Sequence, residues 1–491
     1  MLTRYSPGIE KSSRVLLLLI ILLATGLRLP GFFGNHFHAD EALFASWARL
    51  IAIWCDPLLL TQAVDKPPLL FYLQALAFPM FGPVEWAART PNMIASILLV
   101  PLTAVFTWRL FHDNLSTLLA ALLVATSPMA IQFSPTAFID PLLTAFLIAA
   151  LLFIAGRSRP RWCGLFFGLA VLTKYQAWLF LPLLGGLGWL AGWERRQWKS
   201  MIAGFLAPFL LLLAWQFIRS GSLDLWSAQI NNYGGLRPAW SWELLPRLAG
   251  WAAFWPVMLG SGLMIVLFLA SILVVWFSAQ KSPGTPAYGE RLIILFILGF
   301  SALHWLVAVS VWDRYLLPLV PLSAVITGRG ISLLSKGLLL RGNRTSPKPL
   351  ISIVLILALF AILQLPGSIA AREGLFPVGG QRNADRGAWE VAEYLDQAPY
   401  GTVLYDHWFS WHWRYAFIDK GVYTSWFPHP TGLVDDLQVF GSSPGDRYLV
   451  VPDDESAAPV LRRVEEINFT PRLVLHTDTR PGMILYLLEP S

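Results

Sequence analysis

The chain has 491 residues, of which 56% are apolar and only 13% are charged, and its formal net charge at pH 7 is +6. A soluble domain carries roughly 25% charged residues, so this composition excludes an ordinary soluble protein. The cations lie in short loops between apolar runs, which is typical of cytoplasmic loops and argues against a nucleic-acid-binding surface. Runs of roughly 20 apolar residues recur, each long enough to cross a ~30 Å hydrocarbon layer. The sequence therefore predicts a polytopic α-helical membrane protein.

The first apolar run, residues 15–33, follows Arg4, Lys11 and Arg14. Positive charge before an apolar stretch also suits a signal peptide. This run is longer than a usual signal core, however, and many further runs follow it. We interpret it as an uncleaved first helix with a cytoplasmic amino terminus. Residues 34–87 are then predicted to form the first extracytoplasmic loop.

The later apolar runs are predicted to cross the membrane in alternating directions, giving about 11 to 13 transmembrane helices within a membrane domain of residues 1–370. The runs with clear limits cover residues 88–111, 115–133, 138–155, 162–173, 201–218, 250–278 and 350–365. With this topology each predicted inner loop carries Lys or Arg, as orientation by cytoplasmic positive charge requires. The stretch Leu69–Phe81 is ambiguous. It is too short to cross the membrane comfortably, and counting it would place the basic loops outside, so we predict an interfacial helix within the first loop.

Charged residues return after the last apolar run, and residues 371–491 are predicted to form a soluble, extracytoplasmic α/β domain. Short β-rich runs alternate there with helical patterns. The predicted strands cover residues 403–405, 448–451, 473–476 and 484–488, and the predicted helices cover 386–397 and 455–467.

The predicted topology brings many ionisable residues to one outer face. These residues are Asp40, Glu41, Asp65, Lys66, Arg89, Asp140, Lys174, Arg237, Asp313 and Arg314. Ionisable groups at membrane depth are costly and mark function when they line an inner cavity. For any single residue the alternative is a position at the water interface, with Lys174 extending its ammonium towards water. So many such residues on one face favour a functional site.

Two motifs, Asp40-Glu41 and Lys66-Pro67-Pro68, carry the strongest chemical signal. A carboxylate such as Asp40 or Glu41 suits a general base for a hydroxyl group or a ligand for a hard divalent cation. The alternative is that the pair simply caps the helix that follows it. Lys66 precedes Pro67 and Pro68, and proline suits the first turn of a helix. Free N–H groups with a lysine beside them bind anions, especially phosphate, although two prolines also end a loop.

These motifs resemble those of the membrane glycosyltransferases of GT-C fold that use polyprenyl-phosphate sugars. The closest likenesses are the protein O-mannosyltransferase family and the bacterial aminoarabinose transferases that modify lipid A. The likeness spans roughly residues 15–330. It rests on Asp40-Glu41, Asp65-Lys66-Pro67-Pro68-Leu69, Ala88-Arg89-Thr90-Pro91, Asp140-Pro141, Leu172-Thr173-Lys174 and Arg314.

The resemblance implies a role for each matched residue. Asp40 and Glu41 would be catalytic. The cations that would bind the donor phosphate are Lys66, Arg89, Lys174 and Arg314. Asp140 and Asp65 would hold a divalent Mg, Mn or Zn ion, although the aminoarabinose enzymes carry Glu where this chain has the shorter Asp65. The enzyme would lie in the bacterial inner membrane, with its active site and its carboxyl-terminal domain facing the periplasm.

An outward-facing transferase needs a donor that has already crossed the membrane on a lipid, because nucleotide sugars are cytosolic. We therefore expect an inverting transfer from a polyprenyl-phosphate sugar, such as an undecaprenyl one, to lipid A or lipopolysaccharide, another glycan or a protein. One alternative is a transporter or flippase of lipid-linked saccharides. The other is a polymerase or ligase that uses lipid-diphosphate-linked oligosaccharides.

Overall fold

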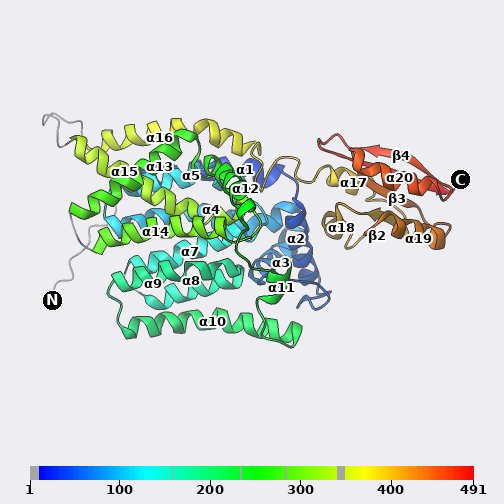
Figure 1. Ribbon diagram of the computed structural model, residues 1–491, viewed down its shortest axis with the longest axis horizontal. Helices are drawn as coiled ribbons and strands as arrows, with labels where there is room; N and C mark the ends of the chain where they lie inside the picture. The colour runs from blue at the N-terminus through cyan, green and yellow to red at the C-terminus, as the bar shows by residue number, and fades with distance from the viewer. Residues whose placement is uncertain (1–9, 157–158, 233–234, 282–284, 340–348, 491) are drawn as a thin grey trace.

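A computed structural model describes residues 10–156, 159–232, 235–281, 285–339 and 349–490. Most helices lie along the long axis of the molecule, and a small α/β domain stands at one end of them with the carboxyl terminus (Figure 1). The helices along the long axis are α1 (Lys11–Gly34), α4 (Glu85–Phe111), α5 (Asn114–Thr126), α7 (Asp140–Ala155), α8 (Pro160–Thr173), α9 (Leu181–Leu190), α10 (Arg195–Ser220), α13 (Gly262–Lys281), α14 (Thr285–Leu306), α15 (Leu319–Leu339) and α16 (Pro349–Arg372).

Other elements connect these helices. They are α2 (Ala39–Ala52), α3 (Leu69–Phe81), α6 (Pro128–Phe133), the 3₁₀ turn η1 (Tyr175–Phe180), α11 (Ser227–Asn232), α12 (Ser241–Leu259) and the 3₁₀ turn η2 (Asp313–Leu316). The end that carries the α/β domain also holds α2, α3 and α11 (Figure 1). The stretch that was predicted to be an interfacial helix forms the helix α3, with the predicted limits.

Among the described residues, five helices are long and apolar enough to cross a membrane, or six if α12 and α13 form one broken span. Fewer helices than the predicted 11 to 13 therefore meet a strict test of length. The difference lies in shorter apolar helices such as α5, α7 and α8, which have 13, 16 and 14 residues. The prediction of 11 to 13 spans requires these shorter helices to cross as well.

Two predicted spans are interrupted, and the structure corrects them. The run 115–133 divides into α5 and α6 at Ser127, whose hydroxyl caps α6, and at Pro128, which has no N–H to continue the ladder. The run 250–278 bends by 92° between α12 and α13. Gly260 lies at this bend with φ +108°, in the left-handed region that favours glycine.

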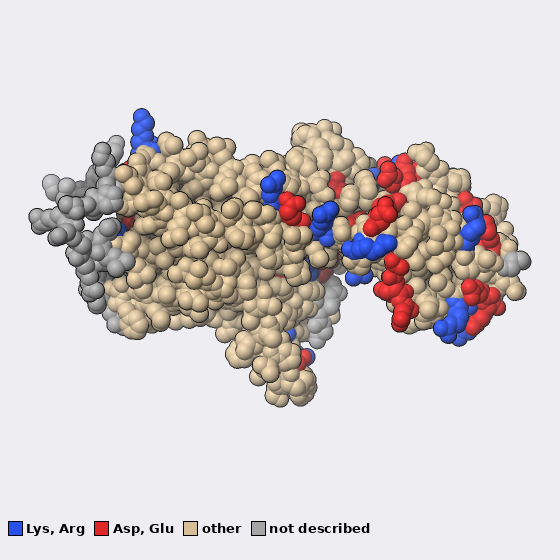
Figure 2. All heavy atoms as spheres, turned by 90° about the horizontal axis from the view of Figure 1, so that it is seen from above, with Lys and Arg blue, Asp and Glu red and all other residues tan. Residues whose placement is uncertain are grey.

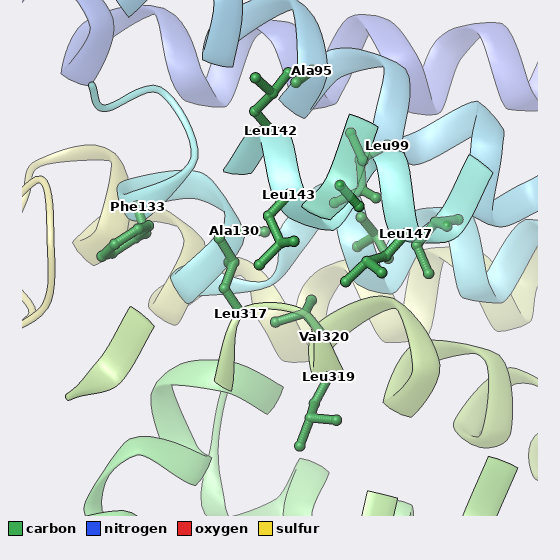
Figure 3. Close-up of a cluster of buried hydrophobic side chains, with 14 of the residues drawn as sticks. Ala95, Leu99, Ala130, Phe133, Leu142, Leu143, Leu147, Leu317, Leu319 and Val320 are labelled. Atoms are coloured by element: carbon green, nitrogen blue, oxygen red, sulfur yellow. The ribbon is translucent and has the colours of Figure 1, made fainter. Parts of the chain in front are cut away.

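Close packing holds the helices together. A Cβ on Gly164 of α8 would lie 1.8 Å from the carbonyl oxygen of Met201, and one on Gly204 of α10 would lie 2.0 Å from that of Arg161. Glycine at both positions therefore lets α8 and α10 approach backbone to backbone, as small residues do in membrane helix pairs. The main core continues through α4, α6, α7 and the start of α15, and Figure 3 shows part of it around Leu143.

The distribution of charge agrees with a membrane-embedded helical part. In the view of Figure 2, Lys, Arg, Asp and Glu are scarce over the helices and gather on the α/β domain and beside its junction with them. An apolar band without charge is what a hydrocarbon environment selects. The chain is thus a multi-pass membrane protein with a soluble domain at one end.

The carboxyl-terminal domain is built on a five-stranded sheet with strand order β2-β1-β3-β5-β4. β1 pairs in parallel with β2 and β3, whereas β5 pairs antiparallel with β3 and β4. The strands are β1 (Thr402–Asp406), β2 (Val422–Trp426), β3 (Arg447–Pro452), β4 (Phe469–His476) and β5 (Met483–Pro490). The helical elements are α17 (Ala388–Tyr394), α18 (Ser410–Ala416), α19 (Pro430–Phe440), η3 (Glu455–Ala457) and α20 (Ala458–Glu465).

All four predicted strands and both predicted helical regions occur in this domain, whereas β2, α18 and α19 were not predicted. The missed α18 packs against α2, in the segment between α1 and α4. Arg49 of α2 donates to the carbonyl of Tyr415 and lies 2.9 Å from the carboxylate of Asp419. A ring nitrogen of His412 lies 3.0 Å from the carbonyl oxygen of Phe37. These contacts fix the soluble domain against the loop that carries Asp40.

Candidate active site

A cavity of about 740 Å³ opens where α2 and the segments that connect the long helices meet α18 of the carboxyl-terminal domain. Its lining includes six of the sequence-predicted site residues: Asp40, Asp65, Lys66, Asp140, Lys174 and Arg314. They come from five separate stretches of the chain. The structure therefore brings most of the predicted site together, although residues 40 and 314 are far apart in the sequence.

The six residues form three ion pairs. The Lys66 ammonium lies 2.5 Å from a carboxylate oxygen of Asp65, and the Lys174 ammonium lies 2.5 Å from Oδ1 of Asp140. Arg314 donates to Oδ2 of Asp40. Three cations thus line one cavity, and the paired acids hold them in position. An anion that enters therefore meets N–H donors that are already in place.

Asp40 owes its position to the first turn of α2. His38 caps this helix, because its Nδ1 accepts from the backbone N–H of Asp40 and its own N–H donates to Glu41. The Asp40 side chain is therefore not needed for capping, and it points to Arg314. Burial alone would raise the pKa of Asp40, but the charge of Arg314 and its hydrogen bond to the carboxylate outweigh burial and hold that pKa below its ordinary value. Asp40 is accordingly ionised at neutral pH.

Aromatic rings fix the guanidinium of Arg314. Its central carbon lies 4.1 Å from the ring centre of Trp312 and 5.4 Å from that of Phe138. Such stacking suits the flat guanidinium and leaves its edges free to donate hydrogen bonds. The neighbouring Asp313 turns away and accepts from the backbone N–H of Gly379 at 2.7 Å.

Lys174 and Asp140 are the most deeply buried of the three pairs, with side chains 3% and 0% exposed. Lys174 follows the last residue of α8, and its ammonium lies 4.5 Å from the ring centre of Tyr315. Asp140 begins α7, and its Oδ2 is buried without a hydrogen-bond partner among the described residues. One carboxylate oxygen of this pair is thus open to a further donor.

Lys66 lies just before α3, whose N-terminal cap is Pro68. The lysine side chain is only 10% exposed, so its ammonium is directed into the cavity rather than into open water. The predicted arrangement of a lysine beside a proline-initiated helix N-terminus is therefore present. This corner has the character of an anion-binding site.

Glu41 and Arg89 do not line the cavity. Nε of Arg89 donates to Glu41 at 3.0 Å, and the same carboxylate accepts from the backbone N–H of Ala137 at 2.7 Å. Arg89 also donates to the carbonyls of Asn35 and His36. The side chains of Glu41 and Arg89 are 0% and 1% exposed. They join α2, α4 and the segment before α7, which is a structural role, and their predicted catalytic and phosphate-binding roles stay predictions.

The predicted metal ligands do not fit a resident divalent cation well. Asp65 and Asp140 are each neutralised by a lysine, and a lysine ammonium competes directly with a metal ion for a carboxylate. The described residues contain no group of three or more His, Cys, Asp or Glu side chains that is able to hold a metal. Each carboxylate would have to leave its lysine before it could hold such a cation.

Several cavity residues were not anticipated from the sequence. Trp411 and Arg414 belong to α18 of the soluble domain, and Arg414 donates to the side-chain amide of Gln62 at 3.2 Å. Nothing in the sequence links residue 414 to residue 62, so only the fold reveals that the soluble domain closes the cavity. Trp312 could have been expected at this site from the sequence, because it directly precedes Asp313 and Arg314.

The chain is similar to known proteins in sequence. The family model described as dolichyl-phosphate-mannose-protein mannosyltransferase matches residues 65–217. The undecaprenyl phosphate-alpha-4-amino-4-deoxy-L-arabinose arabinosyl transferase of Pseudomonas aeruginosa is 29% identical over 276 residues, which cover 50% of this chain and 49% of that protein. The enzyme of that name from Erwinia tasmaniensis is 23% identical over 61% of this chain and 56% of its own length. The chain thus spans about half the length of the curated relatives it matches.

Solved structures are similar over nearly the whole chain. The crystal structure of ArnT from Cupriavidus metallidurans bound to undecaprenyl phosphate has a TM-score of 0.62 at 15% identity, covering 97% of this chain and 98% of that one. An Archaeoglobus fulgidus oligosaccharyltransferase in complex with Zn and sulfate has a TM-score of 0.53 at 13% identity, covering 97% and 73%. These structural likenesses confirm the predicted fold class, and the sequence matches confirm the resemblance inferred from the motifs. They agree with a multi-pass protein of the inner membrane.

Proposed function

We propose that this chain is an inverting glycosyltransferase that moves a sugar from a polyprenyl-phosphate donor to an acceptor on the periplasmic face of the inner membrane. The observation that carries the proposal is the set of three ion pairs on one cavity, Asp65–Lys66, Asp140–Lys174 and Asp40–Arg314. The cavity lies beside the soluble domain, at one end of the helices. The named activities of the relatives support the same donor class.

The donor phosphate binds by exchange of ion-pair partners. Lys66, Lys174 and Arg314 each hold a carboxylate in the free protein, and a phosphate oxygen replaces one or more of these carboxylates. A guanidinium offers a planar pair of N–H groups that suits phosphate. When Arg314 turns to the phosphate it releases Asp40, so donor binding itself prepares the carboxylate for the next step.

The transfer needs no reactant other than the donor and the acceptor. The oxygen or nitrogen of the acceptor attacks the anomeric carbon from the face opposite the phosphate, which inverts that centre. The bond between the anomeric carbon and the phosphate oxygen breaks, and polyprenyl phosphate leaves with the electron pair. The acceptor proton passes to the Asp40 carboxylate, while the cations stabilise the charge that develops on the leaving phosphate.

Proteoliposomes separate this proposal from the flippase alternative. The protein is reconstituted with an undecaprenyl-phosphate sugar, and two quantities are followed: release of free undecaprenyl phosphate and movement of intact donor between leaflets. A transferase releases undecaprenyl phosphate when a suitable acceptor is present and does not accelerate movement of the intact donor. Accelerated movement without any release would contradict the proposal and support a flippase.

Replacing Lys66 by Ala tests the donor site. The change removes one cation from the cavity and leaves Asp65 unneutralised, so it weakens phosphate binding and slows departure of the leaving group. We expect kcat/KM for the donor to fall about 10-fold or more, roughly 1.4 kcal/mol of transition-state stabilisation. Lys420→Ala is the matched control, because Lys420 forms an exposed pair with Asp396 in the soluble domain. Equal kinetics in the Lys66 variant and this control would move the phosphate site to Lys174 and Arg314.

A further inference from the structure

The segment between α6 and α7, residues 134–139, is buried throughout yet is neither helix nor strand. It leads directly to Asp140, and the ring centre of Phe138 within it lies 5.4 Å from the central guanidinium carbon of Arg314. A buried backbone has no water around it, so its polar groups need partners from elsewhere in the protein. The partners of this segment therefore determine where Phe138 and Asp140 lie.

Side-chain amides satisfy three consecutive carbonyls of this segment. The side-chain nitrogen of Asn92, on α4, donates to the carbonyl of Thr136 at 2.6 Å and to that of Phe138 at 2.5 Å. The side-chain nitrogen of Gln74, on α3, donates to the carbonyl of Ala137 at 3.4 Å. Among uncharged side chains only a primary amide carries two N–H groups on one atom. Asn92 is thus able to hold two carbonyls at once.

Both amides contribute through their N–H groups. Asn92 and Gln74 are 0% exposed, and the amide oxygen of each is buried without a hydrogen-bond partner among the described residues. A buried oxygen without a partner destabilises a fold. An apolar side chain of similar size would fill the same space and leave no oxygen unpaired. The bonds to the three carbonyls are therefore what these amides add.

Two of the three ion pairs in the cavity depend on this segment. Phe138 supports the guanidinium of Arg314 from one side, and Asp140, which follows the segment, holds Lys174. The pair that contains Lys66 comes from the stretch before α3 instead. A shift of the segment would therefore displace Arg314 and Lys174 and leave Lys66 in place.

We propose that Asn92 and Gln74 are positioning residues of the transferase, which hold residues 136–138 so that Arg314 and Lys174 meet the donor phosphate together. This inference rests on the proposed function. Neither amide lines the cavity, so neither touches the donor. Asn92 holds two carbonyls at short distance and Gln74 holds one at a longer distance, so Asn92 has the larger effect.

The alternative is that the two amides only stabilise the fold. A purely structural role lowers the amount of folded protein but leaves the activity of each folded molecule unchanged. A positioning role changes the reaction of the folded molecules. Its effect also shrinks when the group that it positions has already been lost, because residues that act together are not additive.

Double variants of the full-length protein in detergent separate these roles. Asn92→Asp keeps the shape of the amide but replaces its nitrogen by an oxygen, so at most one carbonyl keeps a donor. The substitution is made alone, with Asp140→Asn and with Lys66→Ala. Two quantities are measured per folded molecule: the affinity for undecaprenyl phosphate, and kcat/KM for an undecaprenyl-phosphate sugar. Asn468→Asp is the matched control, because Asn468 is exposed in the soluble domain.

Asn92→Leu and Gln74→Met are measured alongside, because they remove the N–H groups without burying a carboxylate. They carry the test if Asn92→Asp does not fold. Asn92→Leu should match Asn92→Asp in both quantities. Gln74→Met should have a smaller effect, about 2-fold to 3-fold, because the bond that it removes is long.

Asn92→Asp alone is expected to lower both quantities about 10-fold, and Asn468→Asp is expected to change neither. Combined with Asp140→Asn, the further loss should be no more than about 3-fold, whereas combined with Lys66→Ala it should remain about 10-fold. Equal further losses in the two combinations would overturn the inference. Unchanged values per folded molecule, with only a lower unfolding temperature, would overturn it as well.

The two measured quantities also distinguish this inference from the proposed function. A protein that binds undecaprenyl phosphate with the expected dependence on Asn92 but never transfers a sugar contradicts the proposed function and leaves the positioning role standing. A protein that transfers the sugar while the losses simply add contradicts this inference alone.

Discussion

Asp40→Asn is expected to lower turnover by about 10²–10⁴-fold, or roughly 3–5 kcal/mol of barrier. The amide keeps the shape of the carboxylate but cannot accept the proton of the acceptor at neutral pH. Folding should change little, because His38 and Glu41 cap α2 and the side-chain contact of Asp40 with Arg314 is partly exposed. Rates from single-turnover experiments with saturating donor give the chemical step directly.

Two further measurements separate the possible roles of Asp40. Affinity for undecaprenyl phosphate should be unchanged or slightly higher in the variant, because Arg314 no longer has to leave a carboxylate. Thermal unfolding in the same detergent should occur near the temperature of the unchanged protein. An Asp40→Asn enzyme with normal turnover would exclude Asp40 as the base. A rate recovered by high concentrations of a divalent cation would instead point to a metal-binding role.

Glu41→Gln is expected to act on folding rather than on chemistry. The change leaves the Arg89 guanidinium buried without its counter-charge, and removing one partner of a buried ion pair typically costs about 3–5 kcal/mol. The amide also offers only one oxygen, so it can accept from the Ala137 and Arg89 Nε donors or from the His38 and Arg89 Nη2 donors, but not from both sets. The midpoint of thermal unfolding should fall markedly, and activity per folded molecule should fall much less than in Asp40→Asn.

Glu489→Gln is the matched control for this substitution. Glu489 pairs with Arg472 across β4 and β5, with both side chains about half exposed. Surface pairs contribute about 0–1 kcal/mol, so the same change of Glu to Gln should barely shift unfolding. A Glu41→Gln protein as stable as this control, but inactive, would return Glu41 to the catalytic role that the sequence suggested.

Sequence reasoning was most reliable where a local pattern is sufficient. The limits of α3 follow from the two prolines before Leu69 and from Gly82, the C-terminal cap that follows Phe81. The alternation of apolar and basic stretches led to one outer face, and six of the predicted site residues do line one cavity. The strands of the soluble domain followed from short β-rich runs between turn residues. All of these signals depend on residues close together in the sequence.

What the sequence could not reveal depends on orientation and on distant contacts. Asp40 and Glu41 are adjacent, yet one turns to Arg314 and the other to Arg89, and only the rotation of α2 decides which faces the cavity. The 92° bend between α12 and α13 lies within a stretch of apolar sequence that resembles a single span. Arg382 and Arg480 line one cavity but come from segments about 100 residues apart, which only the folded domain brings together.

The central claim is that the chain transfers a sugar from a polyprenyl-phosphate donor, and product analysis tests it most directly. Purified protein is incubated with a panel of undecaprenyl-phosphate sugars and a panel of lipid A, glycan and protein acceptors, and the products are separated by chromatography coupled to mass spectrometry. We predict that one donor is consumed, that free undecaprenyl phosphate and a glycosylated acceptor appear in equal amounts, that the new linkage is inverted, and that Asp40→Asn abolishes the reaction. Consumption only of donors linked through a diphosphate, or a product with retained configuration, would contradict the account.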